Sequence, residues 1–456
     1  MASTDVTLAL RQGLSRDPFV PSLAGQVFRP TSSEEVATFL RIIKPFALSL
    51  EARFAIQDGG AQVPPDNEEF DEDVIILDLS SLKGIELHAD GSVSIAAGER
   101  WTSVYEKLGE EGRSVVGARN GEKGIGALAL QGGLSFFSSS RGFVSDNVFN
   151  YQVVLASGDI VDAGADVNSD LWRSLKGGAN NFGIVTRYDM VTFPQGPLWG
   201  GFVYYDPPNF SSQIASMVEE LKRSDASNRT HFIVASAYIA QLDQTVCINR
   251  VYHTDGDEQA PELKPFTMVL PQVDGFGSLG LLSVKEAAAD RSAGAKRRAH
   301  MDTTVKADIG ILEKAVDIFK RAAEHIKTLK DSSLVASIIF EPLPVTLLRG
   351  SAFGYKNRFG LDPSGGPLVS VSFVINWKNQ SDDVEILGTF RNALDEIKRE
   401  ATSRGLAAVF ELMSTACHFQ DPIGSYGTKN KQKMQEVSKK YDPEGIFQKA
   451  VHGTSQ

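Results

Sequence analysis

The chain has 456 residues, with 46 Lys and Arg against 57 Asp and Glu, so its formal net charge is -11 at pH 7. This charge opposes nonspecific binding to nucleic acid and to anionic membranes, and no apolar run approaches the length of a membrane span. Two cysteines, Cys247 and Cys417, exclude a disulfide framework and a cysteine zinc cluster. Because the chain is longer than a typical single domain, we expect two lobes.

The first residues of the chain have neither the basic start nor the apolar segment of a signal peptide. We therefore expect a cytoplasmic protein, or a secreted one if a leader has been removed. We also expect a monomer or homodimer that acts on a hydrophobic small molecule and binds neither nucleic acid nor a membrane.

Short strands and helices alternate along the first part of the chain. Ser32 or Ser33 can cap a helix whose apolar face begins at Val36. Further strands are predicted at 54–56, 74–79 and 92–97, and a second helix at 101–109. This alternation up to about residue 195 predicts a mixed α+β lobe.

Longer strands follow Leu198 and predict a second lobe. They cover residues 199–205, 231–239, 246–252, 334–340 and 368–377. Two long amphipathic helices are expected near 309–328 and 383–404. The fold class is therefore α+β, and the second lobe is a mostly antiparallel sheet backed by helices.

Glycine-rich loops recur in the first lobe. A hydrophobic strand enters the turn Gly59-Gly60, and glycines return at 124–126, 132–133 and 177–183. Glycine lets backbone N–H groups approach a diphosphate closely, although such loops often only make turns.

A series of segments resembles the FAD-binding domain of the berberine-bridge-enzyme-like oxidases, in the same order along the chain. The segments are 54–62, 124–137, 141–143, 146–147, 153–158 and 176–186. These oxidases belong to the vanillyl-alcohol-oxidase type of flavoprotein. Segments 420–427 and 440–448 resemble the family's C-terminal signature. The resemblance implies a PCMH-type FAD-binding domain at 1–195, a substrate-binding domain at 196–417, and a segment at 418–456 that returns to the FAD-binding domain.

The resemblance also implies which residues contact FAD. They lie on the two glycine loops, beside them, and on a later strand: Ile56, Gln57, Asp58, Gly59, Gly60, Ala61, Gln62, Gly117, Gly124, Ile125, Gly126, Gly132, Gly133, Ile184 and Val185.

Several residues depart from the family pattern. Gln57 and Ala61 stand where relatives carry Arg and the His that binds flavin covalently, so FAD must be held noncovalently. Asp58 replaces a small residue, and its carboxylate repels a diphosphate unless it is neutralised. Residues 412–415 replace a Tyr-x-Asn-Tyr run. If they form a strand, Leu412 and Ser414 point toward the site, where we expect them to bind substrate together with His300.

Three residues are catalytic candidates. Glu341 ends a hydrophobic strand where relatives have glutamine; a partly desolvated carboxyl has a raised pKa suited to acid–base chemistry, although a strand-end carboxylate can also face solvent. His418 is expected near the lobe junction, where it is either a general base or a structural histidine at the surface. Asp302 and His300 alternate along a predicted strand. Their side chains either lie on the same face of that strand, where they can act together, or make salt bridges at the surface. The scattered histidines predict no metal site.

Two functions remain open. The retained glycine loops and the segment Ile184-Val185 favour an FAD-linked oxidoreductase that oxidises a hydrophobic small molecule in natural-product biosynthesis. The residues Gln57, Asp58 and Ala61, with the missing Tyr and Asn, favour a non-redox cyclase or isomerase on the same fold, whose flavin binding is weakened or lost.

Overall fold

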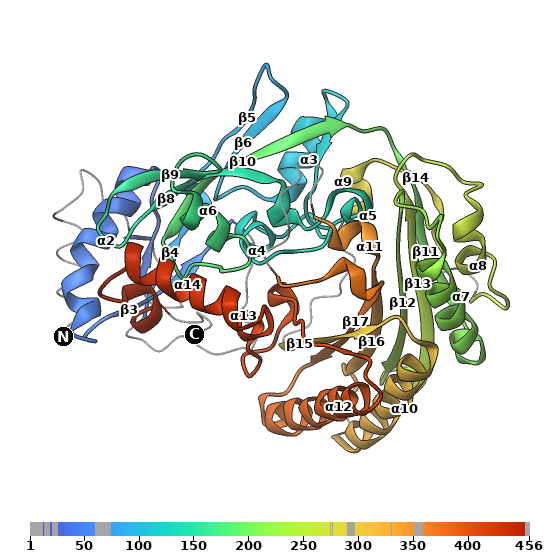
Figure 1. Cartoon of the computed structure of the whole chain (residues 1–456). Helices are drawn as coiled ribbons and strands as arrows, with labels where there is room; N and C mark the ends of the chain where they lie inside the picture. The colour runs from blue at the N-terminus through green and yellow to red at the C-terminus, as the bar shows by residue number, and fades with distance from the viewer. Residues whose placement is uncertain are drawn as a thin grey trace.

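The strands of the computed structural model form three sheets, which lie in two lobes (Figure 1). The structure describes residues 26–59, 74–273, 277–289, 297–329, 331–350 and 359–451, together with residues 12, 19–20 and 275. We call the part with the two smaller sheets the first lobe and the part with the largest sheet the second lobe.

The first lobe begins with a four-stranded sheet in the order β1-β2-β4-β3. Its strands are β1 (Phe19–Val20), β2 (Gln26–Phe28), β3 (Arg53–Gln57) and β4 (Val74–Asp78). Helix α2 (Ser33–Leu48) connects β2 to β3, and the Ser32 hydroxyl caps it by accepting a hydrogen bond from the Glu35 backbone N–H. Its predicted apolar face is buried, which fixes the helix against the sheet.

The second sheet of the first lobe is antiparallel, with the order β5-β6-β10-β8-β9 and β7 paired to β10. The strands are β5 (Ile85–Leu87), β6 (Ser92–Ala96), β7 (Arg113–Val115), β8 (Val148–Val154), β9 (Ile160–Gly164) and β10 (Ile184–Pro194). Helices α3 (Trp101–Gly109), α4 (Gly126–Ala129), α5 (Ser138–Arg141) and α6 (Ser169–Leu175) lie between them in the sequence. The helix expected at 101–109 therefore has the predicted bounds.

The second lobe is built on an eight-stranded antiparallel sheet in the order β14-β11-β13-β12-β16-β17-β15-β18. The strands are β11 (Leu198–Tyr205), β12 (Thr230–Ile239), β13 (Gln244–His253), β14 (Gly280–Leu282), β15 (Arg297–Lys306), β16 (Val335–Leu343), β17 (Leu368–Trp377) and β18 (Ala407–Ala408). Glu341 thus lies inside β16 and not at its end, since β16 continues to pair with β17 as far as Leu343.

Helices cover one face of this sheet. Helices α7 (Phe210–Lys222), α10 (Ile309–Ile326) and α12 (Asp383–Ser403) share a buried apolar cluster with alternate strand residues such as Phe340 and Phe373. The side chains between these alternate residues therefore point to the opposite face, which turns toward the first lobe. The predicted sheet backed by helices is confirmed.

The C-terminal residues pack on the first lobe (Figure 1). Helices α13 (Pro422–Ser425), α14 (Thr428–Tyr441) and α15 (Ile446–Lys449) follow the second lobe in the sequence. The Phe54 N–H donates to the Ala450 carbonyl at 2.9 Å, and Val451 forms a parallel bridge with Phe54. Because Phe54 leads directly into the first glycine loop, the chain end supports the strand that carries this loop. The domain boundaries at 195 and 417 stay a prediction.

Candidate functional site

Asp58 joins the two glycine loops of the first lobe. It follows β3, and its Oδ2 accepts a hydrogen bond of 2.9 Å from the backbone N–H of Ala127. A Cβ on Gly124 would overlap the Asp58 carboxyl group, and one on Gly126 would lie 3.4 Å from Asp58 Oδ2. Gly124 is therefore required for the carboxylate to reach the second loop.

Other residues hold the first loop in place. A Cβ on Gly59 would overlap the Gly98 carbonyl, and Arg100 Nε donates to the Gly59 carbonyl at 2.8 Å. Ile56 and Gln57 are half-buried at the end of β3. The predicted cofactor residues Gly60, Ala61 and Gln62 lie outside the described residues.

The two loops can be compared with what the diphosphate of FAD requires. A diphosphate needs backbone N–H donors and space without side chains. The second loop offers both, because Gly124 and Gly126 lack side chains and the Ala127 N–H already donates to an anionic group. The loops therefore fit an anion, and in this structure the anion is the carboxylate of Asp58.

The remaining predicted cofactor residues lie in the core around the loops. Ile125, Ile184 and Val185 are buried, and a Cβ on Gly117 would overlap the Trp101 ring. Glycine at 117 therefore serves close packing of the backbone on an indole. A direct contact of these four residues with FAD stays a prediction.

Residues 412–415 do not form the predicted strand. Met413–Thr415 is a 3-10 turn, so the expectation that Leu412 and Ser414 point the same way by strand alternation is wrong. Leu412 is buried in an apolar cluster with Phe359, Phe410 and Tyr426, and Ser414 is half-buried. A cause of the turn is the buried carboxylate of Asp302, which accepts hydrogen bonds from Leu412 N–H and Thr415 Oγ, both at 3.0 Å.

The same apolar cluster reaches the glycines at 132 and 133. Both have positive φ angles, +90° and +68°, which favour glycine. A Cβ on Gly132 would lie 2.9 Å from the Phe359 ring and 3.6 Å from Leu412. Leu412, where relatives carry the tyrosine, therefore packs against this loop with an aliphatic side chain, and this side chain offers no hydrogen bond.

His300, Asp302 and Glu341 share the face of the eight-stranded sheet that turns toward the first lobe. Asp302 pairs with Ser372 on β17, and Glu341 pairs with Ser370 on the same strand. Their strands are separated by β17 and their partners lie two residues apart along it, so Asp302 and Glu341 are about 12 Å apart across the sheet and cannot share a proton directly. The predicted common face of His300 and Asp302 is observed.

Glu341 pairs with Arg119 of the first lobe. The distances are 2.6 Å from Arg119 Nη1 to Oε1 and 3.0 Å from Nη2 to Oε2, and Glu341 is 9% exposed. Arg119 Nη1 also lies 2.9 Å from His231 Nε2. Because a guanidinium group only donates, His231 Nε2 is the acceptor and its proton resides on Nδ1. Burial, followed by Arg119 and Arg250, holds the pKa of His231 well below its usual range.

Asp302 is fully buried and links the sheet to the C-terminal segment. Besides its carboxylate bonds to Leu412 and Thr415, its backbone carbonyl accepts from Gln420 Nε2 at 2.7 Å. Burial raises the pKa of Asp302 to about 7, and its hydrogen bonds oppose this shift. The carboxyl group is therefore held by protein donors, as expected for a residue that positions the 412–420 segment.

His300 has a different environment. Its Nε2 is shielded from solvent and has no hydrogen-bond partner among the described residues. Burial, then the positive charges of Arg298, Lys123 and Arg119, lower the pKa of His300 to about 3. His300 is therefore a neutral imidazole with one unused polar atom on the sheet face between the lobes.

His418, the third catalytic candidate, is exposed, and its ring packs against Phe419.

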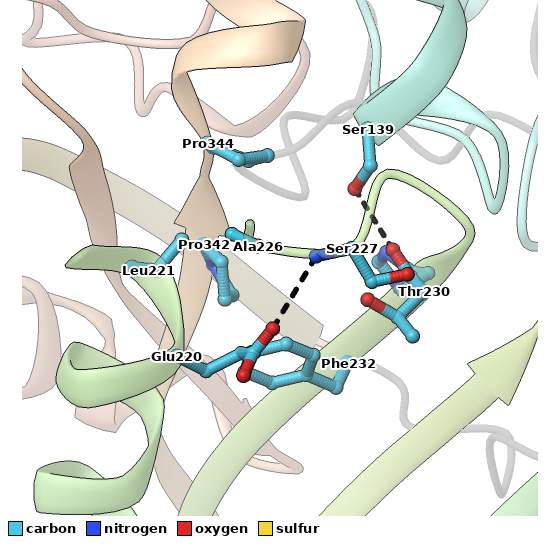
Figure 2. A pocket seen from close by; sticks show the side chains of 10 residues that line it. Ser139, Glu220, Leu221, Ala226, Ser227, Thr230, Phe232, Pro342 and Pro344 are labelled. Atoms are coloured by element: carbon cyan, nitrogen blue, oxygen red, sulfur yellow. Dashed lines mark hydrogen bonds between the residues drawn. The ribbon is translucent and has the colours of Figure 1, made fainter. Parts of the chain in front are cut away.

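A cavity of about 20 Å³ lies beside Ser139, Glu220 and Thr230 (Figure 2), which is room for about one water molecule. A wider hollow of about 230 Å³ opens on the first lobe beside Lys83, Gln152 and Arg187. Neither is lined by a residue that the sequence predicts to bind cofactor or substrate.

Within the described ranges, no three His, Cys, Asp or Glu residues are placed to hold a metal ion. The same part of the chain has no helix long and apolar enough to cross a membrane.

Three residues of the junction, Arg119, His231 and Arg250, were not predicted from the sequence, because their contacts join residues that are far apart in the chain. Arg250 donates to the carbonyls of Arg119 and Ala287 at 3.2 and 3.1 Å, so it belongs to the same junction.

Comparison with known proteins places residues 24–164 in the FAD binding domain family. The chain is 33% identical over 436 residues to an FAD-dependent monooxygenase of Cochliobolus heterostrophus, covering 92% of this chain and 82% of the relative. It is 30% identical over 437 residues to the bifunctional solanapyrone synthase of Alternaria solani, covering 94% and 80%.

Solved structures agree with the fold. The berberine-bridge-enzyme-like protein 1 of Physcomitrella patens superposes with a TM-score of 0.75 at 17% identity, over 98% of both chains. The 6-hydroxy-D-nicotine oxidase of Arthrobacter nicotinovorans gives 0.70 at 18% identity, over 93% of this chain and 91% of that one. The predicted resemblance, the two-lobed α+β fold and FAD as cofactor are confirmed.

Proposed function

Because the chain belongs to the berberine-bridge-enzyme-like family of FAD-dependent oxidoreductases, we propose that it holds FAD noncovalently and oxidises a hydrophobic small molecule at the junction of its two lobes. Noncovalent binding is supported by Ala61, which has no imidazole to bond the flavin. The name of the Alternaria relative, a solanapyrone synthase, supports a substrate from natural-product biosynthesis.

The observation that carries this proposal is the unused Nε2 of His300. A buried polar atom without a partner costs free energy, and a polar group of a substrate can supply the missing hydrogen bond. Ile233 and Ile339 are half-buried on the same sheet face, which suits a ligand that is mostly apolar. Bound FAD supplies the acceptor for the electrons removed from the substrate.

The residues of the chain then bind and orient the substrate. His300 donates or accepts one hydrogen bond as a neutral ring. Arg119 holds Glu341 and His231 in fixed orientations, so these groups form a rigid border of the site. Glu341 and His418 remain proposed acid–base residues, while Asp302 acts through Leu412 and Thr415 as a positioning residue.

To test this, FAD-loaded protein is mixed with candidate hydrophobic substrates under anaerobic conditions. We expect the visible flavin band to bleach, and the product to be two hydrogens lighter than the substrate, because the flavin takes up these two hydrogens. A product of unchanged mass, formed without bleaching, would contradict the proposal and favour the cyclase or isomerase alternative. His300→Phe should raise KM about tenfold or more through loss of one buried hydrogen bond, while His325→Phe, at an exposed site on α10, should leave KM unchanged.

A further inference from the structure

The carboxylate of Asp58 lies where the second glycine loop presents its backbone donors. Its Oδ2 accepts from the Ala127 N–H at 2.9 Å, and its carboxyl group fills the space that a Cβ on Gly124 would take. Tyr188 Oη lies close to Gly126, and the pKa of its buried phenol is raised by burial and also by the charge of Asp58. Asp58 thus reaches from one loop to the other and does not extend into solvent.

Space at this point is limited. A side chain on Gly124 would overlap the carboxyl group of Asp58, and one on Gly126 would lie 2.9 Å from Tyr188 Oη. On the other side, Gly59 is packed against the Gly98 carbonyl and Arg100 donates to the Gly59 carbonyl at 2.8 Å. A diphosphate and this carboxylate therefore cannot occupy the same donors together.

We propose that Asp58 is an internal occupant of the diphosphate position, so that FAD binds only when the Asp58 side chain leaves the Ala127 N–H. The inference rests on the proposed noncovalent binding of FAD. It makes Asp58 the residue that determines cofactor affinity, because the cofactor must displace a bonded carboxylate and then remain near its negative charge.

This arrangement has a consequence for the family pattern. A small residue at position 58 leaves the donors of the second loop open for the diphosphate. The aspartate satisfies one of these donors, the Ala127 N–H, before FAD binds, so the loop without cofactor is stabilised. The chain therefore exchanges FAD with solution and loses it during purification more readily than a protein with a small residue there.

Three probes are titrated into cofactor-free protein: FAD, ADP-ribose and riboflavin. ADP-ribose carries the same diphosphate without a flavin, and riboflavin has no diphosphate. Asp58→Asn removes the charge and keeps the size of the side chain, and Asp58→Gly removes both. We expect Kd for FAD and ADP-ribose to fall roughly 5- to 150-fold in both variants, the range for removing a unit charge about 4–6 Å from another in partly buried surroundings. Riboflavin binding should not change.

Asp90→Asn is the matched control. Asp90 is exposed beside the turn between β5 and β6, and the substitution changes the net charge by the same amount, so FAD affinity should stay at the wild-type value. Asp58→Asn keeps the proposal testable if Asp58→Gly fails to fold. Unchanged or weaker binding of ADP-ribose by Asp58→Asn would overturn the inference. Because ADP-ribose cannot be reduced as a flavin is, this result is independent of whether the protein oxidises a substrate.

Discussion

Arg119 and Glu341 join the two lobes through a bidentate ion pair, with N–O distances of 2.6 and 3.0 Å across 222 residues of sequence. Both side chains are mostly buried, at 18% and 12% exposed. A planar guanidinium group matches a carboxylate in this geometry and fixes its orientation as well as its position. The pair therefore sets how the sheet face of the second lobe meets the first lobe.

Replacing one partner of this pair should destabilise the protein more than replacing both. Glu341→Leu leaves the buried Arg119 without its carboxylate, and such a change costs roughly 3–5 kcal/mol. The double variant Arg119→Met with Glu341→Leu removes both charges and should recover most of that loss. Denaturant unfolding of the two single variants and the double variant measures the coupling. Additive losses would show that the pair contributes nothing to the junction.

Gly124→Ala should destabilise the cofactor-free protein by roughly 1–3 kcal/mol, because the new methyl group overlaps the carboxyl group of Asp58. The loss should shrink in an Asp58→Gly background, where the overlapping atoms are gone. Thermal unfolding of the four proteins measures both effects. The same loss in both backgrounds would mean that the methyl group clashes with something other than Asp58.

The sequence predicts the regular elements well where one face of an element is apolar. The strand expected at 368–377 has the bounds of β17, and the helix near 309–328 matches α10. In both, the buried residues recur at the period of the element, so local pattern and tertiary packing agree.

The turn at 412–415 and the Arg119–Glu341 pair depend on long-range contacts instead. The Leu412 N–H bonds to Asp302, 110 residues earlier in the chain, and no local pattern carries that information. Asp58 is an intermediate case, since its identity predicts repulsion of a diphosphate, whereas its hydrogen bond to Ala127 is visible only in the folded chain.

Any FAD bound to the protein should be released when the chain is denatured with acid. Ala61 has a methyl group where relatives carry the histidine that bonds the flavin, so unfolding removes everything that retains the cofactor. Acid precipitation followed by absorbance of the supernatant checks this, and the yellow colour should stay in solution. Colour in the washed pellet would show that another residue makes a covalent bond.

The pH dependence of stability should contain two opposing contributions from the sheet face between the lobes. The pKa of Asp302 rises to about 7 from its usual value of 3.8, so the folded state binds more protons than the unfolded state between these values. Asp302 therefore makes stability fall as pH rises from about 4 to 7. The pKa of His300 falls from 6.5 to about 3, so His300 makes stability fall as pH drops below about 6.5.

Single variants should separate these contributions. Asparagine at 302 can accept from the Leu412 N–H and donate to Thr415 Oγ, so Asp302→Asn keeps both contacts and removes the titration. Unfolding free energies at pH 5 and pH 8 should then show that Asp302→Asn is more stable than wild type at pH 8 by roughly 2–4 kcal/mol, with a smaller gain at pH 5. His300→Phe should show its gain at pH 5 instead. If Asp302→Asn gave the same difference from wild type at both pH values, Asp302 would not titrate in this range, and its burial would have to be compensated by a neighbouring positive charge.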